Sequence, residues 1–141
     1  MDPFVYSTGP ARVLFGVGML ERLPEEVDRL GGARALVLAT PHQRAVAEDV
    51  VGCLGARAAG IFDRAVMHVP VETARAASDE ACRLAADCLV SVGGGSTTGR
   101  LEQDLSDWGL LLSGKSPVGG GRFSIDLGAT RLDSSNLNLR L

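Results

Sequence analysis

The sequence predicts an α/β fold, in which a parallel β-sheet carries helices on both faces. Three observations lead to this class. Short apolar runs alternate with segments of helical periodicity, turn-forming residues separate them, and the apolar run 88–92 leads directly into the glycine-rich turn 93–99. The 141 residues suffice for one domain with its own core. Because 45% of them are apolar and only 4% aromatic, alanine, valine and leucine must fill that core.

The expected elements alternate between strand and helix through the first 92 residues. Strands are expected at 12–15, 34–39, 57–62 and 88–92, where apolar runs are bounded by turn-forming residues. Helices are expected at 24–30, at 43–54 and from 71 or 72 to 86. Around the first helix, apolar residues fall at helical spacing at Leu20, Leu23, Val27 and Leu30. The side chains expected to face inward from the other two helices are Val46, Val50 and Cys53 or Leu54, then Ala74, Ala81, Leu84 and Ala85.

The first helix has clear start and stop signals. Pro24 is tolerated in a first turn, Glu25 and Glu26 suit the positive end of the helix, and Gly31–Gly32 follows its last turn. Gly16 and Gly18, just before this helix, match half of a dinucleotide-binding fingerprint, but a tight strand-to-helix turn explains them equally well.

Charge and hydropathy argue against several kinds of partner. The net charge is −3 and no run of lysine or arginine occurs, so a nucleic-acid surface is not expected. No apolar run approaches the ~20 residues of a membrane span, and Met1-Asp2-Pro3 does not start a signal peptide. We therefore expect a cytoplasmic protein that acts on a small molecule.

Histidines and cysteines give no sign of a metal site. His42 and His68 are the only histidines, and without a nearby carboxylate cluster they are expected to be solvated or hydrogen-bonded rather than catalytic. Cys53, Cys82 and Cys88 lack the spacing of zinc or redox motifs and lie in apolar stretches. All three are therefore expected to be small, buried and reduced.

The turn from Gly93 to Gly99 is the strongest functional signal. Its glycines leave no Cβ to keep a ligand from the backbone, and Ser96, Thr97 or Thr98 can cap a following helix or donate to an oxyanion. Such a turn at the end of a buried strand is a seat for phosphate. A flexible glycine–serine connector is the alternative. In a parallel sheet, Thr40-Pro41, at the end of an earlier strand, would lie on the same edge.

Several segments resemble the amino-terminal half of the iron-containing alcohol dehydrogenase family, and within it the maleylacetate reductase branch. The resemblance covers about residues 4–99. The segments that carry it are Phe4-x-Tyr6, Arg12-Val13-Leu14-Phe15-Gly16-x-Gly18, Arg34-Ala35-Leu36-Val37-Leu38-Ala39-Thr40-Pro41, Met67-His68-Val69-Pro70-Val71-Glu72 and Ser91-Val92-Gly93-Gly94-Gly95-Ser96-Thr97-Thr98-Gly99.

The resemblance implies an NAD(P)H-dependent reductase with a Rossmann-like nucleotide-binding half and an all-helical half, the latter absent from this sequence. Members of the branch reduce maleylacetate to 3-oxoadipate in the breakdown of aromatic compounds, and a homodimer is implied for the intact family. The cofactor-binding residues implied for this chain are Gly93, Gly94, Gly95 and Ser96 at the pyrophosphate, Thr97 and Thr98 close by, and Thr40 and Pro41 near the adenine ribose.

Two positions depart from the broad family pattern. Many relatives carry an aspartate where Thr40 stands, and a carboxylate there would repel a 2′-phosphate. With Thr40, both NADH and NADPH are expected to be acceptable. Many metal-dependent relatives end the glycine motif in aspartate, whereas Gly99 stands here, as in the maleylacetate reductase branch.

The resemblance stops abruptly after Gly99, which divides the chain into a dinucleotide-binding domain at 1–99 and an atypical tail at 100–141 of uncertain structure. A shifted reading frame or a segment introduced in cloning would explain this, and a genuine short variant with a new tail is the alternative. No residue of the chain can be named as catalytic. The chain is therefore predicted to be the cofactor-binding half of an oxidoreductase, with a catalytically inactive nucleotide-binding module or another dehydrogenase of this type as alternatives.

Overall fold

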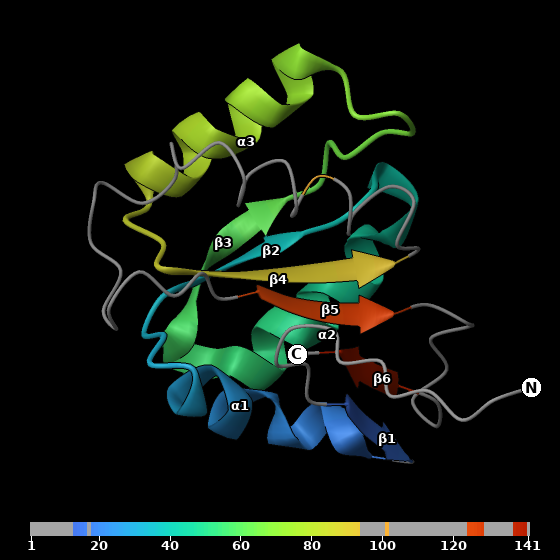
Figure 1. The fold of residues 1–141 in the computed structure, drawn as a ribbon, viewed down its shortest axis with the longest axis vertical. Coiled ribbons are helices and arrows are strands. Elements are labelled where there is room, and N and C mark those ends of the chain that lie inside the picture. The colour runs from blue at the N-terminus through green and yellow to red at the C-terminus, as the bar shows by residue number, and fades with distance from the viewer. Residues whose placement is uncertain (1–12, 17, 94–100, 102–123, 129–136, 141) are drawn as a thin grey trace, which may run out of the picture.

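The structure is a computed structural model that describes residues 13–16, 18–93, 101, 124–128 and 137–140. A sheet lies in the middle of the molecule, with α1 and α2 on one side and α3 on the other (Figure 1). The strands are β1 (Val13–Gly16), β2 (Ala35–Leu38), β3 (Ala58–Phe62), β4 (Cys88–Gly93), β5 (Ser124–Gly128) and β6 (Leu137–Arg140). The helices are α1 (Leu23–Arg29), α2 (Arg44–Leu54) and α3 (Val71–Arg83), with the short 3-10 turns η1 (Met19–Arg22), η2 (Pro41–Gln43) and η3 (Gly55–Arg57).

The six strands form one sheet in the order β1-β6-β5-β4-β2-β3. The neighbours from β5 through β4 and β2 to β3 are all parallel, which confirms the predicted parallel sheet. Strand β6 is antiparallel to both β5 and β1. Within the described residues, β6 is thus the one strand that runs against the other five, an exception that the sequence pattern did not predict.

Two strands of this sheet come from the segment after residue 99. Strand β5 pairs in parallel with β4, from Leu89 opposite Ser124 to Gly93 opposite Gly128. Strand β6 then inserts between β5 and β1. From the sequence alone, Leu105 to Leu112 could form a helical turn or two, but this segment lies outside the described residues. The division of the chain at residue 99 and the origin of its tail stay predictions.

Side chains of the parallel strands alternate between two cores, one on each face of the sheet. Val37, Val90 and Val92 face α1 and α2 in one core. Leu36 and Leu89 belong to the other core, which contains the alanines of α3. Because successive residues of a strand point to opposite faces, an apolar run without alternation is buried on both sides. The prediction of helices on both faces is confirmed (Figure 1).

The first helix starts and stops almost where the sequence predicts. It begins at Leu23, with Pro24 in its first turn, and it is preceded by η1. At its end, Gly31 has φ 78°, and its N–H donates to the Asp28 carbonyl at 2.9 Å, while the Gly32 N–H donates to the Val27 carbonyl at 2.9 Å. These two bonds form a Schellman motif, in which a left-handed glycine ends the helix.

Helix α3 ends earlier than predicted, at Arg83 rather than at residue 86. The Ala85 N–H donates to the Cys82 carbonyl at 3.0 Å and the Ala86 N–H to the Ala81 carbonyl at 2.9 Å, with Ala85 at φ 50°. This is a second Schellman motif, but alanine occupies its left-handed position. The prediction that Ala85 faces inward was wrong, because the left-handed turn leaves Ala85 exposed and buries Ala86 instead.

The inward side of the helices otherwise follows the predicted spacing, with shifts of one position. Helix α2 buries Ala47, Val50 and Leu54, whereas the predicted Val46 and Cys53 are half-buried. Helix α3 buries Ala74, Ala77, Ser78 and Ala81, and Leu84 is half-buried just beyond its end.

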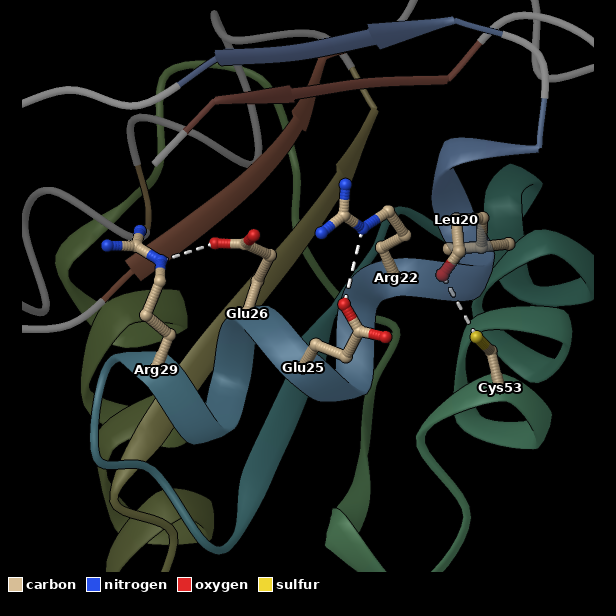
Figure 2. Close-up of polar contacts among 6 residues, drawn as sticks. All are labelled: Leu20, Arg22, Glu25, Glu26, Arg29 and Cys53. Carbon is tan, nitrogen blue, oxygen red and sulfur yellow. Dashed lines mark hydrogen bonds and ion pairs between the residues drawn. The ribbon is translucent and has the colours of Figure 1, made fainter.

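Glu25 and Glu26, both predicted at the positive end of α1, have different surroundings. Glu25 is exposed and pairs with Arg22 at 3.2 Å, whereas Glu26 is only 2% exposed and its Oε2 accepts a hydrogen bond from Arg29 at 2.6 Å (Figure 2). A buried carboxylate needs a partner because its desolvation is costly. Arg29, on the next turn of the helix, supplies one.

The three cysteines differ in exposure. Cys88 is buried and Cys53 is half-buried, with its thiol donating to the Leu20 carbonyl at 3.0 Å (Figure 2). Burial, and secondly the charge of Glu21, raise the pKa of the Cys53 thiol, so it stays protonated. The prediction that all three are buried was wrong for Cys82, which is exposed on the outer side of α3.

A carboxylate clamp holds the starts of the neighbouring strands β2 and β4 together. Asp87, just before β4, accepts hydrogen bonds from the backbone N–H groups of Ala33 at 2.9 Å and Arg34 at 2.8 Å. The guanidinium group of Arg34 in turn donates to the Leu84 carbonyl at 2.9 Å and 3.0 Å. These bonds fix the pairing that begins with Ala35 opposite Cys88.

Candidate cofactor-binding site

The carboxyl ends of β2 and β4 lie level with each other. Their parallel pairing sets Leu38 opposite Ser91, and Thr40 and Gly93 each follow two residues later. The backbone of Thr40 is extended, and Pro41 then starts the 3-10 turn η2, which leads into α2. Two of the positions predicted from the sequence, Thr40 and Gly93, are therefore brought to the same edge of the sheet.

Thr40 is half-buried and holds the turn that follows it. Its carbonyl accepts from the Gln43 N–H at 3.0 Å, and its hydroxyl donates to the Gln43 Oε1 atom at 3.0 Å. Two hydrogen bonds between the same two residues orient the Gln43 side chain relative to the end of β2. Pro41, the other position predicted here, is exposed on the turn between them.

Gly93 is the last residue of β4, and its backbone requires glycine. Its φ is +125°, in the region that side chains disfavour. A Cβ at this position would lie 2.3 Å from the Gln43 Oε1 atom and 2.5 Å from its Nε2 atom. The carboxamide of Gln43 thus occupies the space directly beside the bare backbone of Gly93.

Gln43 is a member of this edge that the sequence reasoning missed. The sequence pattern predicts residue 43 only as the start of the helix at 43–54, although its spacing of three residues from Thr40 is a signal for a side-chain contact across a 3-10 turn. Its contact with Gly93 joins β2 and β4. The other predicted cofactor-binding positions, Gly94, Gly95, Ser96, Thr97 and Thr98, lie outside the described residues.

Charges near this edge are paired. Arg44, the first residue of α2, donates to Asp63 at 2.6 Å and to Glu48 at 3.0 Å. The hydrogen bond from Arg44 holds the pKa of Asp63 below its ordinary value, and the bonds to Asp63 and Glu48 raise the pKa of Arg44. Asp63, which follows β3, is therefore ionised and paired with the positive charge of Arg44. The pairing offsets the negative charge of Asp63, which reduces its repulsion of an anionic ligand at Thr40.

The segment after β3 also lies against the end of β2. The Ala39 N–H donates to the Phe62 carbonyl at 2.8 Å, and the Ala65 N–H donates to the Ala39 carbonyl at 3.1 Å. Beyond this point Met67 is 67% exposed, and His68 has a φ of 63°. The segment that follows β3 thus places an exposed apolar side chain, Met67, and a left-handed residue other than glycine, His68, shortly after its contact with the end of β2.

Both histidines, His42 and His68, are exposed. In the same part of the chain no cluster of three or more histidine, cysteine, aspartate or glutamate side chains could hold a metal ion. No helix among the described residues is long and apolar enough to cross a membrane.

Together the fold and this edge define a class of protein: an open α/β domain whose strand ends form a polar rim, where such domains bind ligands. The chain belongs to the iron-containing alcohol dehydrogenase family, because the sequence profile of that family, "Iron-containing alcohol dehydrogenase", matches residues 10–99. This agrees with the resemblance inferred from the sequence motifs.

Individual relatives point to one branch of the family. The chain is 57% identical over 99 residues to a maleylacetate reductase of Burkholderia cepacia, an alignment that covers 70% of this chain and 28% of that protein. The crystal structure of maleylacetate reductase from Rhizobium sp. strain MTP-10005 superposes with a TM-score of 0.66 at 50% identity, covering 74% of this chain and 30% of that one. The corresponding enzyme of Agrobacterium tumefaciens gives a TM-score of 0.62 at 49% identity, covering 68% and 27%.

The chain thus spans less than a third of the length of the relatives that it matches. What it shares with them is the amino-terminal α/β part, up to the glycine turn.

Proposed function

We propose that this chain is the cofactor-binding part of an NAD(P)H-dependent reductase that converts maleylacetate to 3-oxoadipate. The observation that carries the proposal is the meeting of Thr40 and Gly93 at one edge of the sheet, in a chain that is 57% identical to a maleylacetate reductase over 99 residues. We further propose the cytoplasm as its place of action and a homodimer as its assembled form, both by analogy with the family.

The residues at the edge fit a dinucleotide. The proposed pyrophosphate site is the turn that begins at Gly93 and continues through Gly94, Gly95 and Ser96, with Thr97 and Thr98 beside it. Backbone N–H groups of a glycine turn after a buried strand suit phosphate oxygens. The proposed ribose site is Thr40 with Pro41, where the neutral Thr40 hydroxyl, which donates its proton to Gln43, can accept a hydrogen bond from a ribose hydroxyl.

Cofactor preference follows from the charge at Thr40. A carboxylate at the end of the second strand selects NADH, because it binds ribose hydroxyls and repels a 2′-phosphate. Thr40 is neutral, and the nearby Asp63 is neutralised by Arg44 at 2.6 Å. We therefore infer that NADH and NADPH are both accepted.

The chemistry assigned to this part of the enzyme is positioning. The bound nicotinamide cofactor supplies the hydride that reduces the substrate. The described residues at this edge would hold the ribose and the diphosphate of the cofactor and so orient it. No residue of the chain is assigned as a catalytic acid, so we expect little or no turnover from these 141 residues alone.

Binding of NADH is the direct test. We expect NADH to bind the purified chain, seen as a change in its fluorescence, and Gly94→Val to abolish binding by placing a branched side chain in the phosphate turn. The matched control is Gly52→Val on α2, where an added Cβ meets nothing within 4 Å. Equal binding by the wild-type chain and Gly94→Val would refute the proposed pyrophosphate site.

A second assay separates the enzyme from a binding module. Consumption of NADH with maleylacetate as substrate is expected to be absent for the chain alone. Measurable turnover would show that the 141 residues include the catalytic groups and would overturn the assignment of the chain as a binding part only.

A further inference from the structure

Gln43 is held in place at the rim from two sides. Its Oε1 atom accepts the hydrogen bond from the Thr40 hydroxyl at 3.0 Å. Its carboxamide also fills the space beside Gly93, where a Cβ would come within 2.3 Å of Oε1 and 2.5 Å of Nε2. The side chain therefore bridges the end of β2 and the end of β4, although the two residues it contacts are distant in sequence.

The Nε2 atom of the Gln43 carboxamide carries two N–H donors. Oε1 is engaged by Thr40, which leaves the two N–H bonds of Nε2. Within the part of the chain that the structure describes, no hydrogen bond from Nε2 is formed. Gln43 as a whole is half-buried, so its side chain is not enclosed in the core.

We propose that Gln43 is a positioning residue for the diphosphate of the dinucleotide, to which its Nε2 donates a hydrogen bond. This inference rests on the proposed function. A phosphate oxygen is favoured over a ribose hydroxyl because the Gln43 carboxamide lies directly beside Gly93, where the proposed pyrophosphate turn begins, while its Oε1 atom is engaged by Thr40. The Thr40–Gln43 bond then fixes the donor before the ligand arrives, which lowers the cost of ordering it.

Replacing the amide by a carboxylate separates this role from a structural one. Gln43→Glu has the same shape, keeps an oxygen that accepts from Thr40 and leaves the space beside Gly93 unchanged. It exchanges only the Nε2 donor for an anionic oxygen, which repels phosphate. Gln43→Met removes donor and acceptor without adding charge. His42→Glu is the matched control, because it places the same negative charge on the neighbouring exposed residue of the same turn.

The experiment measures the affinity of the full chain for NADH by fluorescence, and for ADP and adenosine by competition. We expect Gln43→Glu to weaken NADH and ADP about tenfold or more, the loss typical of a hydrogen bond to a charged group, and Gln43→Met to weaken them several-fold. Adenosine, which has no phosphate, and the His42→Glu variant are expected to change by no more than about twofold. Far-UV circular dichroism and the melting temperature verify folding, and Gln43→Met decides the question if Gln43→Glu does not fold.

Each contrary outcome has a distinct meaning. NADH binding by Gln43→Glu or Gln43→Met that equals the wild type overturns the inference and leaves the proposed function standing. An equal loss for adenosine and ADP, or an equal loss in His42→Glu, also overturns it, because the effect is then not directed at phosphate. Failure of the wild-type chain to bind NADH overturns the proposed function, and the role of Gln43 falls with it.

Discussion

Ala85→Gly is expected to stabilise the protein, because alanine stands where the end of α3 requires a left-handed residue. Ala85 has φ 50° and is exposed, so the substitution relieves backbone strain and removes no core contact. The left-handed conformation costs a residue with a Cβ roughly 1–2 kcal/mol. The added freedom of glycine in the unfolded chain offsets about 0.4–1 kcal/mol of this. A net gain of about 0.5–1 kcal/mol remains, equivalent to a rise in Tm of roughly 2–4 °C.

The matched control is Gly31→Ala at the end of α1. Gly31 has φ 78° in the same pair of hydrogen bonds, so alanine there introduces the strain that Ala85→Gly removes. We expect a loss of about 1 kcal/mol. Urea denaturation followed by far-UV circular dichroism measures both variants. A decrease in stability for Ala85→Gly, or a neutral Gly31→Ala, would refute the reasoning from helix ends.

Three further predictions concern the rim, the clamp and pH. Gly93→Ala is expected to weaken NADH binding at least about tenfold, because the new Cβ would lie 2.3 Å from the Gln43 Oε1 atom and force the carboxamide to move. Unchanged affinity in the fluorescence titration would contradict this. Asp87→Ala, which leaves the N–H groups of Ala33 and Arg34 without their acceptor, is expected to cost about 1–3 kcal/mol in urea denaturation, and a loss below the error of the fit would count against the clamp. The hydrogen bond from Arg57 at 2.6 Å lowers the pKa of Asp28, so this pair stabilises the fold above the pKa of an unfolded aspartate and ceases to do so as the pH falls through the lowered pKa. The fall in Tm below about pH 4 should therefore be shallower in Arg57→Met, and the same slope in both proteins would show that the pair contributes nothing.

The part of the fold that could be predicted from the sequence is the part set by local pattern. The run from Cys88 to Val92 is apolar at four of five positions and is buried on both faces, and Pro24 and Gly31 delimit the first helix. The same reasoning failed at Ala85, because no glycine marks the left-handed turn there. Strands β5 and β6 were missed because each contains only two apolar residues, too few for a sustained period, and because they pair with distant parts of the chain.

For the candidate site, the sequence was sufficient for residues whose role depends on backbone position. Thr40 and Gly93 could be placed at one edge because both follow buried parallel strands. Gln43 could not be assigned to that edge, since its contact with Gly93 depends on the register between β2 and β4 and on the rotamer of a long side chain. Neither of these quantities is encoded in a local motif.

The Asp87 clamp has a consequence at the opposite end of the sheet. By fixing where β2 and β4 start, it determines which residues arrive together at the far rim. Sliding one strand by a single residue would carry Gly93 about 3.3 Å along the strand axis and turn each apolar side chain to the wrong face. A carboxylate that no ligand would touch thus sets the alignment by which Gln43 meets the backbone of Gly93.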